Sequence, residues 1–254
     1  MMAKQTKYSF EDPEVWIPSD EKKAKKDIPF LIKIFKKYGK VKKVLDVGSG
    51  MGRHTYFLSK KGYKCEGIEP HPKMVEYARK HYLDVTYKVN SMQNINYKNQ
   101  FDALICLFSV IGFNKSNEEI VRTLKKFYNA LKKEGILIIE AYNNINWLAN
   151  NSFKKNYVDV NIEKNEKTII KEWINTNNQS VVSERAYYSI TDNKKLGEFT
   201  KESRMLFPLE LKFFLESAGF KVLRMLSADS LDKMTLKDSI LDKRRLLVIA
   251  KKIN

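Results

Sequence analysis

The length, composition and charge of this chain exclude several classes of protein. Its 254 residues, 43% of them hydrophobic, can bury a full core, so a disordered chain is excluded. No apolar run reaches the roughly 18 residues of a membrane span, and the two cysteines are too few for a disulfide framework. We expect a cytoplasmic protein without a membrane partner, either a monomer or a homodimer.

The formal net charge of +17 has two interpretations. It fits a nucleic acid, an anionic surface or a phosphorylated substrate as the partner. However, lysine pairs recur along the whole chain, from Lys25-Lys26 to Lys194-Lys195, instead of gathering in one stripe. We therefore favour a solvated, lysine-rich surface and keep RNA binding as the alternative.

Up to about Tyr142 the chain alternates short apolar runs with amphipathic segments. A first helix is expected from about Asp27 to Tyr38, with Asp27 as its N-cap and Pro29 in its first turn. Strands alternating with helices imply a doubly wound α/β domain with a parallel sheet. The expected strands are 43–48, 63–69, 85–89, 101–108 and 135–142, and the expected helices are 53–61, 71–82 and 116–133.

The pattern changes after Tyr142. Residues 143–203 are rich in Asn, Lys, Thr and Tyr and contain alternating segments that are typical of antiparallel strands. The α/β pattern then resumes with a helix between Pro208 and Gly219 and two strands at 221–227 and 244–252. We predict an α/β core from 1–142 and 204–254, and an antiparallel lid, 143–203, over the ligand-binding edge of the sheet.

The stretch VLDVGSGMGRH, residues 44–54, indicates the kind of ligand. A dinucleotide fingerprint needs a third glycine where Arg53 stands, which disfavours a nicotinamide cofactor. Gly48 and Gly50 allow the backbone to pass close beneath a ligand, and the N–H groups that open the next helix suit a carboxylate. Asp46 would repel a pyrophosphate and attract an ammonium group. Together these groups favour an amino acid.

A second acid follows the next predicted strand. Glu69 stands nineteen residues after Gly50, where a carboxylate can accept two hydrogen bonds from a ribose diol. The ligand predicted by the two segments is therefore an amino acid joined to a nucleoside.

The segments LDVGSGMG and IEPHPKM together resemble class I S-adenosylmethionine-dependent methyltransferases. The resemblance implies a Rossmann-like, seven-stranded, mostly parallel sheet with an antiparallel last strand, and S-adenosylmethionine as the cofactor. The residues that it places at the cofactor are Asp46, Gly48, Ser49, Gly50, Glu69, Pro70, Met74, Ser91, Met92, Leu107 and Phe108.

Residues 105–144 are similar to the small-molecule N-methyltransferases that dimethylate nucleotide-linked amino sugars. This resemblance implies that Glu140 lies at the floor of the pocket and that Arg204 faces the substrate. The chain departs from the pattern at two positions. Phe113 follows Gly112 where the sugar enzymes carry a histidine, and Ser91 stands where the family has an aspartate that reaches the adenine amino group.

The methyl acceptor is expected to be a small amine that carries an acidic group. Glu140, Tyr142 and a lid tyrosine such as Tyr187 are alternative general bases, and Arg204 is the expected anion clamp. We expect no metal, because the three histidines lack ligand spacing beside cysteines or paired acids.

Three alternatives remain at this point. An RNA methyltransferase would explain the charge, although the strand end CLFS lacks the Asn/Asp-Pro-Pro-aromatic signature of base-amino methylation. Cytosine C5 chemistry at Cys106 is disfavoured, because this cysteine lies within an apolar run. A non-catalytic S-adenosylmethionine-binding protein would keep the glycine loop and lose the substrate pocket.

Overall fold

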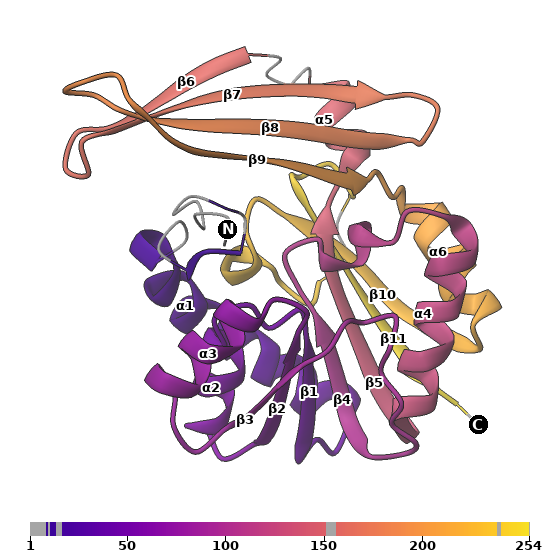
Figure 1. Ribbon diagram of the computed structural model, residues 1–254. Helices are drawn as coiled ribbons and strands as arrows, with labels where there is room; N and C mark the ends of the chain where they lie inside the picture. Colours follow the sequence, from indigo (N-terminus) through magenta and orange to yellow (C-terminus); the bar gives the residue numbers. More distant parts are fainter. Residues whose placement is uncertain (1–8, 10, 14–16, 151–155, 238–239, 254) are drawn as a thin grey trace.

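Two sheets form the framework of the protein. The computed structural model describes residues 9, 11–13, 17–150, 156–237 and 240–253. A seven-stranded sheet lies between helices, and a four-stranded antiparallel sheet covers one edge of this core (Figure 1). Among the helices of the described ranges, none is long and apolar enough to cross a membrane.

The large sheet has the predicted class of topology. Its strand order is β10-β11-β5-β4-β1-β2-β3, and the five strands from β5 to β3 are parallel to one another. Only the last strand of the chain runs antiparallel to both neighbours within this sheet, which confirms the predicted fold class. The strands are β1 (Lys43–Val47), β2 (Lys64–Glu69), β3 (Thr86–Val89), β4 (Phe101–Cys106), β5 (Leu131–Tyr142), β10 (Phe220–Ala228) and β11 (Arg245–Lys252).

Helices bury both faces of this sheet. Along β4, Ala103 and Ile105 pack into one apolar cluster, and Leu104 and Cys106 pack into the other. Because successive side chains of a strand point to opposite faces, a doubly covered strand must be apolar throughout. The helices are α1 (Ile17–Tyr38), α2 (Arg53–Ser59), α3 (Pro72–His81), α4 (Asn117–Ala130) and α6 (Pro208–Ser217), with short 3-10 turns η2 (Val110–Phe113) and η3 (Leu231–Lys233).

The first helix is longer than predicted. It begins at Ile17, so the prediction that Asp27 is its N-cap is wrong, and Pro29 lies inside the helix. Asp27 is buried, and its Oδ2 lies 3.0 Å from Nε2 of His54 at the start of α2. The charged segment before Asp27 has little apolar periodicity, because the described side chains from 21 to 26 are exposed apart from Ala24.

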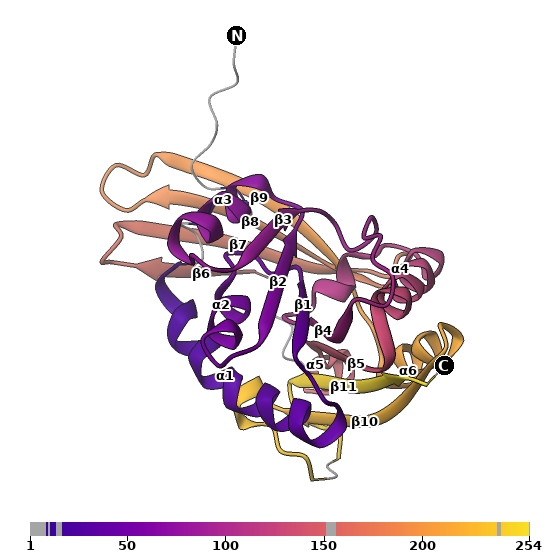
Figure 2. The same cartoon turned by 90° about the horizontal axis from the view of Figure 1, so that it is seen from below.

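The four-stranded sheet confirms the predicted antiparallel insertion. It contains β6 (Asn156–Asn161), β7 (Glu166–Asn175), β8 (Ser180–Ser189) and β9 (Lys195–Arg204), each antiparallel to its neighbours. The sequence pattern did not predict β6, whose residues are mostly exposed, or the short helix α5 (Asn144–Ala149), which has only six residues. We call β6–β9 the lid sheet. It lies across the end of the core where β1, β4 and β5 finish, and in the view from below it extends past α3 (Figure 2).

Candidate functional site

The glycine loop joins β1 to α2 at the lid-facing edge of the core. Gly48 has φ +71°, and a Cβ at this position would lie 2.6 Å from the side chain of Val110. Gly50 has φ +53°, but a Cβ there would meet open space. Both positions favour glycine because of their left-handed backbone. The loop therefore packs tightly at Gly48 and leaves free volume above Gly50.

Asp46 supplies a buried carboxylate directly before this loop. The side chain accepts a hydrogen bond of 2.7 Å from the Thr55 hydroxyl. Burial raises the pKa of Asp46, because loss of solvent disfavours the charged form. A positively charged ligand would restore the favourable environment of the carboxylate. Nearby, the Ser49 hydroxyl is buried without a hydrogen-bond partner in the described structure.

The second predicted acid lies beside the loop. Glu69 Oε2 accepts a hydrogen bond of 2.9 Å from the Gly50 N–H. Its other oxygen, Oε1, lies 2.5 Å from Nδ1 of His71. This hydrogen bond raises the pKa of His71 above its ordinary value. The structure thus brings together Gly50 and Glu69, which sequence analysis assigned to one ligand, and adds His71.

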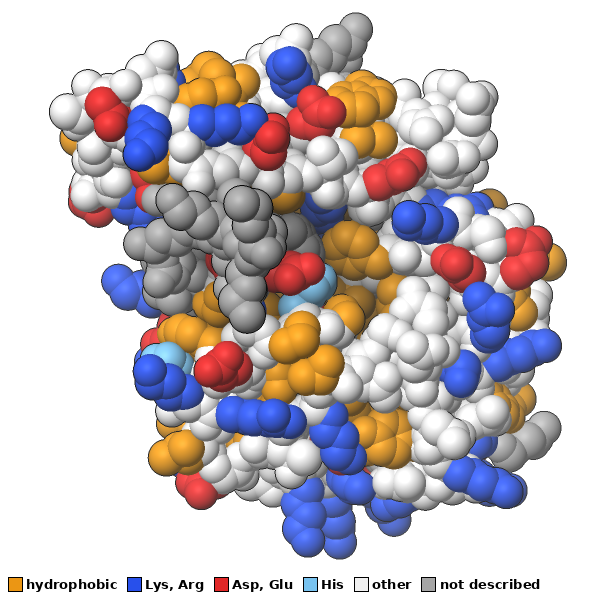
Figure 3. All heavy atoms as spheres, viewed as in Figure 1, with side chains coloured by type: hydrophobic (Ala, Val, Ile, Leu, Met, Phe, Trp, Pro, Cys, Tyr) orange, Lys and Arg blue, Asp and Glu red, His pale blue; other side chains and the backbone are white. Residues whose placement is uncertain are grey.

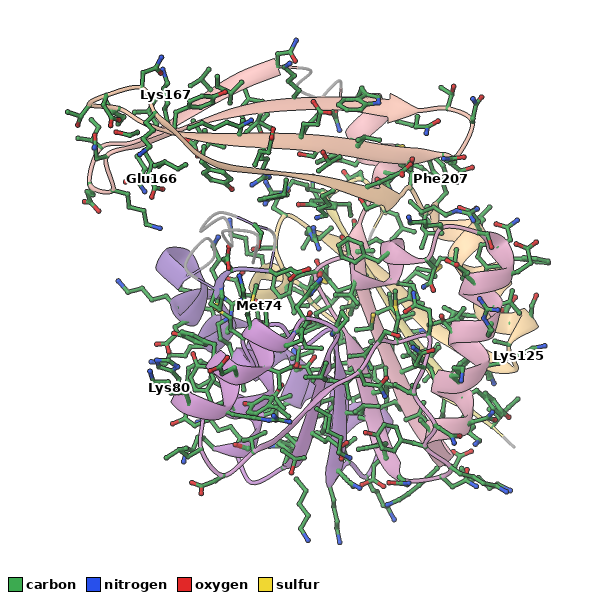
Figure 4. The ribbon with its side chains drawn as sticks, in the orientation of Figure 1. Met74, Lys80, Lys125, Glu166, Lys167 and Phe207 are labelled. Atoms are coloured by element: carbon green, nitrogen blue, oxygen red, sulfur yellow. The ribbon has the colours of Figure 1, made fainter. Side chains whose placement is uncertain are left out.

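The remaining predicted cofactor residues follow the carboxyl ends of three parallel strands, β2, β3 and β4. Met74 is buried near the start of α3, at the lid-facing end of the core (Figure 4). Phe108, in contrast, is 48% exposed. Their contacts with a cofactor stay predictions. The residues are Pro70 and Met74 after β2, Ser91 and Met92 after β3, and Leu107 and Phe108 after β4.

The loop after β4 is held in an unusual conformation. Phe108 and Ser109 have φ values of +55° and +65°, a left-handed backbone that is uncommon for residues other than glycine. Glu140 stabilises it: its Oε2 accepts a hydrogen bond of 2.6 Å from the Phe108 N–H, and its carbonyl oxygen accepts one of 3.0 Å from the Ser109 N–H. Strained backbone that its surroundings hold in place is typical of functional sites.

Glu140 is also paired with a cation that sequence analysis missed. Nε of Arg245 donates to Glu140 Oε1, and the guanidinium lies 4.1 Å from the centre of the Tyr142 ring. Arg245 comes from β11, the strand that pairs with β5 at Tyr142, so only the sheet topology reveals the contact. Both oxygens of Glu140 are therefore engaged, which fits a positioning residue better than a general base.

A cavity lies between the lid sheet and the carboxyl edge of the core. Its volume is about 70 Å³. Tyr142 and Arg204, predicted for the acceptor site, both line it, whereas Tyr187 is buried elsewhere in the lid sheet. On the side shown in Figure 3, hydrophobic side chains, acids and a histidine lie in the hollow between the two sheets. The lining residues that sequence analysis missed include Glu172, Ser183, Arg185 and Lys201.

Arg204 ends β9 at the wall of this cavity. Its side chain is 10% exposed, and Nη2 donates a hydrogen bond of 2.7 Å to Glu210 Oε1. Its Nε is buried and has no hydrogen-bond partner in the described part of the protein. The backbone of Arg204 packs against Gly112, where a Cβ would lie 3.1 Å from the Arg204 carbonyl oxygen. The close contact positions Arg204 against the loop that follows β4.

Cys106 lies inside the core. It is fully buried in β4, and burial raises the pKa of its thiol. This environment does not suit a nucleophile. Among the described residues, no three His, Cys, Asp or Glu side chains form a group that could hold a metal ion.

Comparison with known proteins identifies the class of the core. Residues 44–135 match the family model of the methyltransferase domain. This match lies within the core, from β1 to the first part of β5. One relative, a dTDP-3-amino-3,4,6-trideoxy-α-D-glucopyranose N,N-dimethyltransferase from Streptomyces venezuelae, is 28% identical over 39% of this chain and 42% of its own. A glycine/sarcosine N-methyltransferase from Aphanothece halophytica is 31% identical over 45% of each chain. The chain thus spans less than half of the length of either relative.

Solved structures show the same fold over nearly the whole chain. The CcbJ methyltransferase from Streptomyces caelestis has a TM-score of 0.76 at 13% identity, covering 91% of this chain and 90% of that one. An S-adenosylmethionine-bound amino pentose methyltransferase from Micromonospora echinaspora has a TM-score of 0.69 at 18% identity, covering 89% of each chain. The predicted similarity to amino-sugar methyltransferases is confirmed, and so is the methyltransferase fold.

Proposed function

We propose that the protein transfers a methyl group from S-adenosylmethionine to the amine of a small molecule bound beneath the lid sheet. The observation that carries this proposal is the position of the cavity. It is walled on one side by Ser109, Gly112 and Tyr142, at the ends of β4 and β5, and on the other by the lid sheet. The glycine loop and Glu69 lie at the same edge of the core, so donor and acceptor would meet there.

The groups around the glycine loop fit S-adenosylmethionine. Asp46 is a buried acid suited to the positive ammonium, Gly50 borders open space, and Glu69 offers carboxylate oxygens to a ribose diol. The Ser49 hydroxyl is a further buried group without a partner in the described structure. When bound, the cofactor supplies an electrophilic methyl group, so the protein does not need a covalent catalyst.

The protein's own contribution is mainly orientation. Glu140 and Arg245 fix the loop of Phe108 and Ser109, and Ser109 Oγ in turn accepts a hydrogen bond of 2.9 Å from the Tyr142 N–H. This network holds the wall of the cavity in one geometry. Orientation of reacting groups supplies up to about 7–11 kcal/mol of barrier reduction. We keep Tyr142 as the candidate that handles a proton at the acceptor.

An RNA acceptor is the second candidate, and the net charge of +17 favours it. On the face in Figure 3, Lys and Arg side chains are spread over core and lid and mixed with acids, which does not favour a single docking stripe. Incubation with methyl-labelled S-adenosylmethionine and either fractionated metabolites or bulk RNA tests the choice. Label in the metabolite fraction supports our proposal, and label in RNA alone overturns it.

A further inference from the structure

A row of polar residues crosses the cavity side of the lid sheet. Ser183 of β8 is paired with Glu172 of β7 on one side and with Lys201 of β9 on the other. Directly opposed residues of neighbouring strands point to the same face of a sheet. All three line the cavity, together with Arg185 and Arg204. The row is therefore a continuous polar surface above the ends of β4 and β5.

Two buried groups in this surface lack a hydrogen-bond partner in the described structure. They are the hydroxyl of Ser183, a residue only 6% exposed, and Nε of Arg204. Buried polar groups are nearly always satisfied, so each such group needs a reason. A guanidinium nitrogen can only donate, and a serine hydroxyl donates readily. A ligand rich in hydrogen-bond acceptors would satisfy the Ser183 hydroxyl, which lies beside Lys201 in the row; Arg204 lies three residues further along β9, at the end of the cavity.

The charge of the cavity wall points to the same kind of ligand. Arg185, Lys201 and Arg204 are cationic, and Glu172 is the acid among the described lining residues. Glu210 compensates Arg204. Burial and the nearby guanidiniums of Arg185 and Arg245 lower the pKa of Lys201 to about 8, although Glu172 opposes this change. These surroundings thus disfavour the charge of the lysine, and a bound anion would favour it.

The size of the cavity limits the anion. Pockets for drug-sized ligands are roughly 300–1,000 Å³, whereas this cavity measures about 70 Å³. A cavity of this size fits an acidic group and a short carbon chain better than a nucleotide.

We propose that Ser183 and Lys201 hold a single oxyanion of the acceptor, a carboxylate or a phosphonate, with Arg204 at the end of the cavity, and that the acceptor is an amino acid or a molecule of similar size. The proposal rests on the methyltransferase function proposed above. It narrows the acceptor class, because it excludes nucleotide-linked sugars as well as amines without an acidic group.

Matched amines test this acceptor class. Initial rates of methyl transfer are compared for glycine, β-alanine and 2-aminoethylphosphonate against glycinamide and ethanolamine, with a dTDP-linked amino sugar as the large acceptor. We expect at least about tenfold higher kcat/KM for an acid-bearing amine than for its neutral counterpart. Equal rates for neutral amines, or a preference for the nucleotide sugar, would overturn the inference while leaving methyl transfer itself established. Absence of transfer to every amine would instead contradict the proposed function.

Substitutions in the polar row test which of its residues produce the preference for acid-bearing amines. Lys201→Met and Ser183→Ala should raise KM for the preferred acid by about tenfold and a few-fold, with a smaller change in kcat. Lys171→Met is the matched control, because Lys171 is an exposed lysine of β7 on the opposite face from Glu172. A fall in kcat at unchanged KM in Lys201→Met would overturn the anion-binding role, since a proton-accepting lysine would behave in that way.

Acetate provides a probe of Lys201 that carries no amine. Its inhibition constant against the acceptor should increase as the pH rises above about 8, because the protonated lysine binds the anion and the neutral lysine does not. The same inhibition constant should be independent of pH in Lys201→Met. If acetate inhibits the wild type and Lys201→Met with one pH profile, Lys201 does not hold the oxyanion.

Discussion

The core sheet and the lid sheet use their residues in opposite ways. In the core, β4 is apolar and fully buried on both faces from Ala103 to Cys106. The lid sheet is mostly half-exposed, and its buried positions include two polar residues, Ser180 and the cavity-lining Ser183. Packing therefore determines which residue types the core can use, whereas polar residues of the lid sheet are available to contact a ligand. The family match, residues 44–135, lies entirely within the core.

Replacement of the lid sheet should have the largest effect. We expect replacement of residues 156–203 by a flexible glycine–serine linker to reduce methyl transfer by about 100-fold or more, because misplacing an acceptor by even 1 Å can cost about 10²-fold. Asn143 and Asn144 stay in place, since they donate hydrogen bonds to carbonyl oxygens of Leu241, Lys243 and Leu206.

Calorimetry with S-adenosylhomocysteine and a thermal unfolding curve serve as the controls for this variant. Cofactor affinity should stay within a few-fold of the wild type, because the glycine loop and Glu69 belong to the core. A folded variant that transfers methyl groups at the normal rate would remove the functional distinction between the two sheets.

The second prediction tests the core side of the comparison. Glu69→Ala should weaken S-adenosylhomocysteine binding by about 10–100-fold, because hydrogen bonds to a charged group contribute about 1.5–3 kcal/mol. Glu66→Ala is the matched control: Glu66 is a buried acid of the same strand, paired with Lys88. Titration calorimetry of both variants decides the matter. Equal losses in the two would indicate damage to β2 rather than loss of a ligand contact.

Arg204→Lys has a smaller expected effect, on the lid side. Lysine keeps the charge but loses the Nε donor and the planar fork, so KM for the acceptor should rise by about tenfold with little change in turnover. Steady-state kinetics at low and moderate salt provide the measurement. A steep salt dependence with no response to this substitution would favour an RNA backbone as the partner.

The smallest effect concerns His71. The hydrogen bond to Glu69 raises the pKa of His71, so this pair stabilises the fold at low pH and loses its contribution as the pH rises through that raised pKa. If a ribose hydroxyl replaces His71 as the hydrogen-bond partner of Glu69 Oε1, the pKa of His71 falls. Cofactor binding then releases the His71 proton. Affinity for S-adenosylhomocysteine should then increase about threefold between about pH 6 and 8. His71→Asn should remove this dependence, and an unchanged pH profile would show that the histidine keeps its bond.

The fold of the core could be predicted from the sequence, because its local apolar patterns match the faces that its helices and strands bury. Alternating apolar runs predicted the parallel sheet, and Gly50 and Glu69, which their spacing assigned to one ligand, lie together, with a hydrogen bond of 2.9 Å between them. The start of the first helix was mispredicted, because Asp27 is stabilised by His54, a residue on another element. The error arose where a polar residue finds its partner through tertiary structure.

The lid side of the site was less predictable for the same reason. Arg245 meets Glu140 only because β11 pairs with β5, 105 residues apart in sequence. Ser183 and Lys201 are ordinary polar residues of alternating strands until the register of β8 and β9 sets them side by side above the cavity. Strand register of this kind cannot be read from the residues of a single segment.

The central claim is that the acid–glycine loop and Glu69 hold an amino acid joined to a nucleoside. Calorimetric titration of the wild-type protein with S-adenosylhomocysteine, and separately with NAD, tests it most directly. We predict one binding site for S-adenosylhomocysteine and no heat of binding for NAD, because Asp46 and Arg53 oppose a dinucleotide. Binding of NAD, or no binding of S-adenosylhomocysteine by the folded protein, would contradict the claim.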